Sequence, residues 1–406
     1  MFASKRTGDA SGTHLWPVLL VGAFAVLSCG EPGSPPGGAE QAYDSGPGAA
    51  EEVARPPGSH VRQVRTDPTF STGGTEASTL FDVQGAATLG SRVVVANGGD
   101  ATLRYFEGSG IPLRRVGRRG GGPEEFGNIV WARRCSTDPP LLYVYDRSRL
   151  RMSVYDSIGT QVDAFPFVLP DNRAPYRIAC DNDGHFVTTE WDFDPNAMGA
   201  FTLPTDVIYT TSGRTHRRIG TFTGPDRFRS GLSGRPQPFG ADLHVALGRD
   251  RIYVGDARGD SILVFAVNGE LSDTVMIAAT DRQISDQDID AYIESQLGDA
   301  VGDDRRNQRA WWHREMVFPE RYPAFDELRV DALNQLWVRA YPRPDADSVT
   351  WWIFDPSGEQ YAELVLPVDL EVFEIGFDHV LGLRTDALGI ERVESYPLTR
   401  TGTGQR

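Results

Sequence analysis

One feature constrains the fold of this chain more than any other: a unit of sequence that repeats from about residue 79 to the C-terminus. Each unit contains short runs in which apolar residues alternate with polar ones, rich in Val, Ile, Tyr, Phe and Trp, which is typical of β-strands. The clearest mark of the unit is a strand that ends in a turn with glycine, at 105–110, 154–159, 208–213, 264–269 and 353–358. Glycine suits these turns because a tight hairpin needs a positive φ. The repeat therefore predicts an all-β fold made of several small antiparallel sheets.

Six such units can be delimited, and each is predicted to form a blade of four strands. They span 79–117, 128–167, 175–220, 242–277 and 325–367, and the last begins at 372. The last unit supplies only three strands, at 372–378, 379–386 and 390–397, whereas a strand-like segment at 60–66 precedes the first unit. We predict a six-bladed β-propeller in which 60–66 closes the last blade, because closure removes exposed sheet edges.

The connection between the first two units resembles the inter-blade signature of NHL-type six-bladed propellers. In Val116–Phe126 a Gly-rich turn leads to Gly-Pro-Glu-Glu-Phe, where the family has Gly-Pro-Gly-Glu-Phe, so Glu124 replaces the last glycine. Segment 143–159 is similar to the strand–turn–strand core of the same repeat. The resemblance implies the propeller architecture over about 79–397. It implies no activity, because such propellers serve as scaffolds, ligand binders and enzymes.

The N-terminus has the pattern of an export signal. Lys5 and Arg6 precede an apolar run at 16–27 that is short for a membrane span. Val26-Leu-Ser-Cys29 resembles the lipobox of bacterial lipoproteins, which implies that residues 1–28 are removed and that Cys29 carries lipid. An ordinary signal peptide with an incidental cysteine is the alternative. Residues 29–58, rich in Gly, Pro, Ala, Glu and Ser, predict a disordered tether before a propeller domain at 59–406.

These features place the protein in the bacterial cell envelope, lipid-anchored on the periplasmic or cell-surface side. The net charge of −16 argues against nucleic acid as a partner, because nucleic acids attract clustered positive charge. The sequence contains no Gly-x-Ser-x-Gly, His-Glu-x-x-His or Cys-x-x-Cys motif. Lys5 is the only lysine, so the mature chain has none for a Schiff base or a P-loop. We expect a monomer without a cofactor.

The long insertions all fall in connections that a propeller places on one face. They are 193–205, 221–241 and 278–324, and the last is expected to form a small helical insertion, with a helix N-cap at Ser285 and a second helix at 305–316. Long loops on a rigid scaffold commonly carry function, so this face is the candidate binding face, with neutral loop growth as the alternative. The residues expected there are Arg118, Arg119, Glu124, Glu125, Asp146, Arg147, Trp191, Arg258, Asp260, Trp311 and Trp312. The charged residues among them also fit solvated turns, and the two adjacent tryptophans also fit packing against the propeller.

Two cysteines, Cys135 and Cys180, are one repeat apart and are predicted at matching positions on the inner strands of adjacent blades. A disulfide needs Cα atoms roughly 4.4–6.8 Å apart. The sequence does not give this distance, so a disulfide and two buried thiols both stay open.

Metal ligands are sparse in the sequence. His185 and His379 begin equivalent strands of different blades, too far apart to share an ion. Asp192, Asp194 and Asn196 alternate like the start of a calcium loop, but the glycine and the closing glutamate are missing, so a turn is the simpler interpretation and calcium in or near the channel the alternative.

The favoured function is a binding or interaction module that takes an unknown protein, peptide or glycan on its loop-rich face. The other possibility is a metal-dependent hydrolase or lyase with its site in the central channel. That enzyme would need several inward-facing Asp, Glu, Asn or His side chains, and no unit shows an obvious set.

Overall fold

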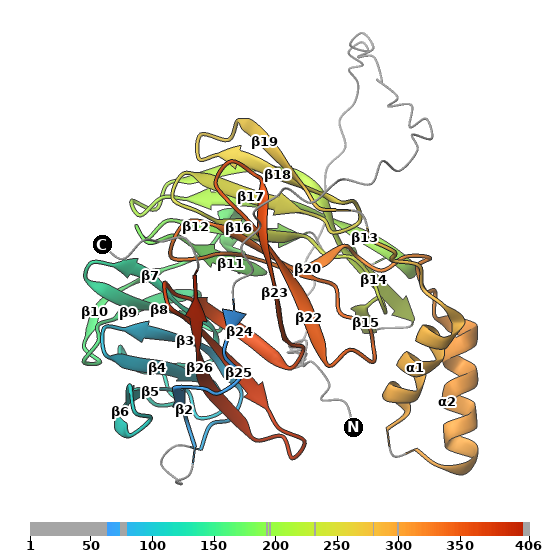
Figure 1. Ribbon diagram of the computed structural model, residues 1–406, viewed down its shortest axis with the longest axis horizontal. Coiled ribbons are helices and arrows are strands. Elements are labelled where there is room, and N and C mark those ends of the chain that lie inside the picture. Colours follow the sequence, from blue (N-terminus) through green and yellow to red (C-terminus); the bar gives the residue numbers. More distant parts are fainter. Residues whose placement is uncertain are drawn as a thin grey trace, which may run out of the picture. The chain divides into compact units, whose positions relative to one another are not determined.

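The computed structural model of the protein describes residues 63–73, 79–191, 194, 196–230, 233–278, 280–298 and 300–400 (Figure 1). All of them belong to one compact unit, which includes Arg55–Arg406. The predicted signal peptide, Cys29, the predicted tether and residues 60–62 lie outside the described residues. Within the described part of the chain, no helix is both long enough and apolar enough to cross a membrane.

The described strands form six separate antiparallel sheets, and the first two contain four strands each. The first sheet consists of β3 (Val83–Leu89), β4 (Arg92–Asn97), β5 (Thr102–Glu107) and β6 (Pro112–Val116). The second consists of β7 (Ile129–Thr137), β8 (Pro140–Asp146), β9 (Arg151–Tyr155) and β10 (Gln161–Pro166), followed by a 3-10 turn at Pro170–Asn172. In each sheet the strands lie in chain order, as the repeat predicts.

The third sheet is larger than predicted. Its strands are β11 (Arg177–Cys180), β12 (Phe186–Trp191), β13 (Gly199–Thr210), β14 (His216–Ser230) and β15 (Ser233–Pro236). The expectation that 193–205 and 221–241 are loops is therefore wrong for much of their length. There β13 and β14 pair along almost their full extent, and β15 adds a fifth strand.

Two residues of these strands are types that disfavour a strand when judged from sequence alone. Pro204 cannot donate a hydrogen bond to a neighbouring strand, but a register shift between Thr202 and Pro204 accommodates it. Gly224 looks like a strand breaker, yet the close approach of β13 requires it, because a Cβ there would lie 1.8 Å from the hydroxyl oxygen of Thr205. Both residues fit strands only through tertiary contacts.

The fourth and fifth sheets again contain four strands each. The fourth consists of β16 (His244–Leu247), β17 (Arg251–Gly255), β18 (Ser261–Ala266) and β19 (Leu271–Met276). The fifth consists of β20 (Phe325–Val330), β21 (Leu336–Ala340), β22 (Ser348–Phe354) and β23 (Gln360–Pro367). Between them lie helices α1 (Asp286–Leu297) and α2 (Gly302–Glu315), which confirm the predicted helical insertion. The hydroxyl of Ser285 accepts a hydrogen bond from the backbone N–H of Asp288, so Ser285 is the N-cap of α1 as predicted.

The last sheet is completed from both ends of the described chain. It contains β24 (Leu370–Ile375), β25 (His379–Thr385) and β26 (Glu391–Thr399), together with β1 (Gln63–Val64) and β2 (Phe70–Ser71). Gln63 pairs with Thr399 and Val64 with Leu398, so the predicted pairing of the N-terminal strand is found where that strand is described. The second N-terminal strand, β2, was not predicted and pairs with β26 at Ser395 and Glu394.

The six sheets pack on one another in a cycle. Six of the apolar cores in the described residues lie between sheets, one for each pair of consecutive sheets. The sixth joins the last sheet to the first, through Phe373 and Leu381 on one side and Val95 and Phe106 on the other. Contacts between first strands follow the same order, from β24 to β3, β7, β11, β16 and β20. The chain therefore has a β-propeller-like all-β fold.

A disulfide joins two of these first strands. Cys135 of β7 and Cys180 of β11 are bonded, with their Cα atoms 5.6 Å apart. Cys135 is fully buried in the core between the second and third sheets. The bond links consecutive sheets across one of the six interfaces.

Candidate functional site

The long connections of the third and fourth sheets fold together into one structure. We call it the wall and define it as residues 226–230, 233–239 and 285–318, excluding Asp299, which is not described. Its apolar core consists of Phe228 from β14, Ile293 and Leu297 from α1, and Trp312 and Met316 at the end of α2. Figure 1 shows the two helices beside β14 and β15. The insertions are thus not separate loops.

The tryptophans predicted for the binding face lie in this wall. Trp312 is buried and Trp311 is half-buried. The Arg235 guanidinium of β15 lies 5.3 Å from the ring centre of Trp311 and 5.5 Å from that of Trp312. At these distances a cation is attracted to the face of an aromatic ring. Gln237 adds a hydrogen bond of 2.9 Å from its side-chain amide to the carbonyl of Val317.

Arg258 and Asp260, also predicted for this face, fasten the wall to the fourth sheet. Both lie in the turn between β17 and β18. Arg258 donates to the carbonyl of Gly224 at 2.9 Å and pairs with Asp226, the first residue of the wall. Asp260 pairs with the buried Arg282, at 2.7 Å, where the chain enters the helical insertion. Arg282 also donates to the carbonyl of Tyr322, at 3.0 Å, where the chain leaves it.

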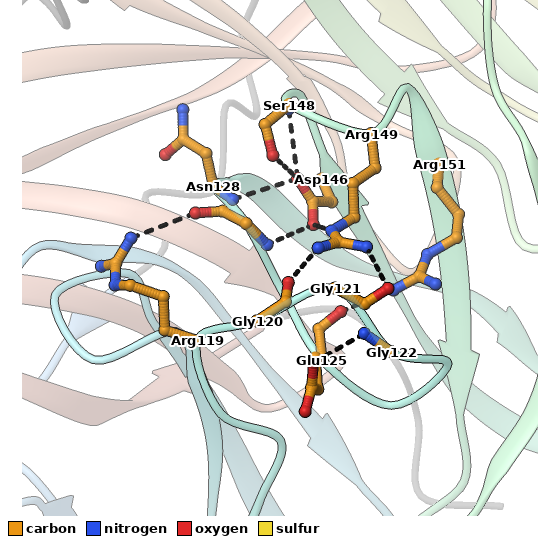
Figure 2. Close-up of polar contacts among 11 residues, drawn as sticks. Arg119, Gly120, Gly121, Gly122, Glu125, Asn128, Asp146, Ser148, Arg149 and Arg151 are labelled. Atoms are coloured by element: carbon orange, nitrogen blue, oxygen red, sulfur yellow. Dashed lines mark hydrogen bonds and ion pairs between the residues drawn. The ribbon is translucent and has the colours of Figure 1, made fainter.

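A second group of predicted residues organises the connection between the first two sheets (Figure 2). Asp146, at the end of β8, is fully buried. Its carboxylate accepts hydrogen bonds from the backbone N–H groups of Gly127 at 2.6 Å and Asn128 at 3.0 Å. It also accepts from the hydroxyl of Ser148 at 2.8 Å and pairs with Arg149 at 3.2 Å. Asp146 therefore holds the Gly-rich connection against the turn after β8.

Most other charged side chains of this connection have partners within the connection itself. Glu125 pairs with Arg118 at 2.7 Å and accepts from the backbone N–H of Gly122 at 2.6 Å. The hydrogen bond from Gly122 and the charge of Arg118 hold the pKa of Glu125 below its ordinary value. Arg119 donates to the carbonyl of Gly127 at 3.1 Å. Glu124 is exposed and Arg147 is half-buried. That these residues contact a ligand stays a prediction.

Trp191, at the end of β12, forms an aromatic pair with Tyr176. The two rings are 5.6 Å apart between centres and nearly perpendicular. Arg227 of β14 lies 5.9 Å from the centre of the Trp191 ring. The third sheet thus carries an aromatic pair and a cation beside its first strand.

A group of charged residues that the sequence pattern did not predict lies at the first strands of the sheets. We call it the central cluster and define it as Arg133, Arg177, Asp242, Glu327, Arg329, Glu371 and Glu374. They lie on, or directly before, β7, β11, β16, β20 and β24. Arg329 pairs with Glu327 at 2.6 Å, and Arg177 pairs with Asp242. Burial opposes the charges of both members of the Arg177–Asp242 pair, but their attraction raises the pKa of Arg177 and lowers that of Asp242.

Arg133 reaches from β7 toward the first and the last sheets. Its guanidinium lies 4.8 Å from the ring centre of Phe373 on β24. Glycine at position 85 of β3 leaves room for it, because a Cβ there would lie 2.6 Å from the Arg133 Nη1 atom and 2.1 Å from the Ala132 carbonyl oxygen. Burial lowers the pKa of Arg133 to about 9, and the charge of Arg329 acts in the same direction.

Glu374 links three sheets. It pairs with Arg134 of β7 at 3.1 Å and with His379 of β25 at 3.4 Å. It also accepts a hydrogen bond of 2.8 Å from the backbone N–H of Thr88 on β3. These partners belong to the second, last and first sheets, so Glu374 joins the two ends of the sheet cycle.

Bulges explain why the alternation of residues did not reveal the cluster. In four of the six sheets the pairing of the first and second strands shifts register within the first strand. Two of these shifts end at Glu327 and Glu374. A bulge re-aims the side chains that follow it. A signal was nevertheless present, because β7 and β24 each carry two charged residues among apolar ones, and β20 carries three.

Within the described residues, no group of three or more His, Cys, Asp or Glu side chains is arranged to hold a metal ion. Asp192 and two of its neighbours lie outside the described residues. The carboxylate of Asp194 accepts a hydrogen bond of 2.8 Å from the backbone N–H of Asn196, which is the geometry of a turn.

Comparisons with known proteins identify no relative. No protein-family model matches the chain, and no curated protein is significantly similar to it. Solved structures of similar architecture include a member of the DUF4221 family from Bacteroides vulgatus, 10% identical, covering 84% of this chain and 100% of that one, with a TM-score of 0.49. A Bacteroides fragilis protein assigned as exported is 10% identical over 84% of this chain and 95% of that one, at 0.47. Virginiamycin B lyase from Staphylococcus aureus is 10% identical over 84% and 99%, at 0.39. Likenesses at this level assign no function.

Proposed function

We propose that this chain is a six-bladed β-propeller that acts outside the cytoplasm as a binding module, with the wall as its contact surface. The observation that carries the proposal is that two long connections, distant in sequence, share one apolar core, with Phe228 from the first and Ile293 and Trp312 from the second. Connections that had lengthened neutrally would have no reason to pack on one another. A preorganised surface loses less conformational entropy on binding a partner.

The proposal of six closed blades is supported by the cyclic order of the inter-sheet cores. The proposed location outside the cytoplasm is supported by the signal-like residues 1–28, and the proposed lipid anchor by the lipobox-like segment that ends at Cys29. Metabolic labelling with radioactive palmitate tests the anchor. The full chain should incorporate label, and Cys29→Ser should not. Equal labelling of both chains would refute lipid attachment at this residue.

The binding role is tested by retention of partners from envelope extract on the unit that begins at Arg55. Met198 and Val317 are exposed apolar residues beside and within the wall, 60% and 52% accessible. The double variant Met198→Asp and Val317→Asp should lose most of the retained material, because charge at an apolar contact must be desolvated.

A matched control introduces aspartate at two exposed apolar residues beside the turns on the other face of the sheets. Ile158 and Leu271 are exposed to a similar degree, 51% and 58%, beside the turns between the third and fourth strands of their sheets. The double variant Ile158→Asp and Leu271→Asp should retain partners as the parent does. If both double variants bind equally, the wall is not the contact surface.

A further inference from the structure

We propose that the central cluster binds a carboxylate, and that Arg133 is the residue that holds it. This carboxylate site rests on the proposed function in one respect, namely that the chain is a binding module. It is distinct from the wall. The wall would contact a macromolecule, whereas the central cluster would take a single monoanionic group.

Two guanidinium groups meet at Phe373 of β24. Arg133 lies over its ring, and Arg329 donates to its carbonyl oxygen at 3.2 Å. They come from the second and the fifth sheets. The charge of Arg329 acts on Arg133, and the two like charges repel each other unless anions compensate them.

The two guanidinium groups differ in their carboxylate partners within the protein. Arg329 has a carboxylate partner, Glu327, at 2.6 Å. Among the residues that the structure describes, no carboxylate lies within ion-pair distance of the Arg133 guanidinium, which donates only to the carbonyl of its own neighbour, Ala132, at 2.8 Å. A guanidinium has five N–H donors in a planar fork that fits a carboxylate. Arg133 is half-buried and not sealed in the apolar core, so a bound anion could complete its hydrogen bonds.

The surroundings favour a monoanion over phosphate. Glu327, Glu371 and Glu374 all lie near enough to act on the charge of Arg133. They repel any anion, and they repel a dianionic phosphate about twice as strongly as a carboxylate, so phosphate is disfavoured relative to a carboxylate. The carboxylate could belong to a free small acid or to the C-terminus of a peptide.

Titration calorimetry with four probes separates these cases: acetate, N-acetylglycylglycine, its C-terminal amide and inorganic phosphate. The protein is the unit that begins at Arg55. We expect the carboxylates to bind and the amide and phosphate not to. Tighter binding of acetate would indicate a free acid, and tighter binding of the peptide a chain terminus. If neither carboxylate binds, or if phosphate binds more tightly, the proposal is overturned.

Arg133→Met should weaken carboxylate binding at least tenfold, and Arg133→Lys should weaken it less, because lysine keeps the charge without the fork. Arg115→Met is the control, since Arg115 is exposed on β6 and its loss changes the net charge equally. Circular dichroism reports whether each variant is folded. If Arg133→Met does not fold, the comparison of Arg133→Lys with the parent protein tests the proposal. Binding unchanged in a folded Arg133 variant would overturn the assignment. Retention of partners by the wall is measured separately, so a failure of carboxylate binding at Arg133 can be told apart from a failure of the proposed function.

Discussion

At the scale of single residues, carboxylates that cap the backbone are the recurrent device of this chain. Asp156, Asp181, Asp331, Asp355 and Asp386 each accept hydrogen bonds from the backbone N–H groups two and four residues later. An aspartate in a turn therefore needs no ligand to explain it. Asp146 applies the same chemistry over a longer distance and from a buried position.

We predict that Asp146→Ala destabilises the protein strongly. The substitution leaves the N–H groups of Gly127 and Asn128 and the guanidinium of Arg149 without their buried acceptor. Losing such a buried charged acceptor costs about 3–5 kcal/mol. The measurement is the free energy of unfolding in urea. Asp250→Ala, at an exposed turn position, should change it by less than about 0.5 kcal/mol. Similar losses in the two variants would contradict the structural role of Asp146.

His379 should make stability depend on pH. Burial disfavours its charge, but Glu374 and Asp378 outweigh burial and raise its pKa above the ordinary value. Burial likewise opposes the charge of Glu374, but His379 and Arg134 lower its pKa. The histidine therefore stabilises the fold below its ordinary pKa of about 6.5, and this contribution is lost as pH rises through the raised value. The contribution of Glu374 is lost as pH falls below its ordinary pKa of about 4.3.

His379→Gln removes the titrating group and should lower the free energy of unfolding at about pH 6 by roughly 1 kcal/mol, with a smaller effect at about pH 9. Urea titrations at the two pH values measure the difference. His313→Gln is the control, because the His313 side chain is 47% exposed on α2, and its loss should change the free energy of unfolding by less than about 0.5 kcal/mol. An equal effect of His379→Gln at both pH values would show that its role is packing alone.

At the scale of elements, the N-terminal strands are short yet well held. Phe70 of β2 is buried against Phe106, with ring centres 6.2 Å apart. Thr72 is fully buried and exchanges two hydrogen bonds of 2.9 Å with the backbone of Val393 on β26. These contacts cover what would otherwise be an open edge of the last sheet.

A chain that begins at Thr79 should therefore be less stable than one that begins at Arg55, by about 3–5 kcal/mol for the loss of the buried phenylalanine alone. It should also aggregate, because the freed edge of β26 can pair with another chain. Urea denaturation and light scattering measure the two effects. Shortening the C-terminus to Arg400 is the control and should be neutral. A monomeric, equally stable chain from Thr79 would show that β1 and β2 do not protect the sheet.

The elements also show how far the sequence could be interpreted. Glycine turns and alternation located most strands of the six sheets but not β2 or β15, and Ser285 located α1. Pro204 and Gly224 disfavour strands locally, and the contacts that accommodate them come from β13 and β14 together. Arg133 and Glu327 could not be recognised as one group, because only the arrangement of the sheets, with bulges in several first strands, brings them together. Local signals thus predicted the elements but not the site between them.

At the scale of the whole molecule, the cyclic order of the cores makes the starting point of the chain arbitrary. The native chain completes its last sheet from both ends, with Gln63 beside Thr399. In a closed cycle any other sheet could be completed in the same way. Loop tips are the sites where new chain ends are tolerated. Gly213 and Arg214, exposed in the turn between β13 and β14, are such a site.

A circular permutant that joins Arg400 to Gln63 through a short Gly-Ser linker and begins at Arg214 should therefore fold. Its third sheet would be completed from both termini, and its free energy of unfolding should stay within about 1 kcal/mol of the parent, because no core is cut. Urea denaturation and formation of the Cys135–Cys180 disulfide measure the outcome. A permutant that begins at Arg133, within a first strand, should fail because it cuts the interfaces of three sheets. If the permutant that begins at Arg214 also fails to fold, the sheets do not form the closed cycle on which the six-bladed assignment depends.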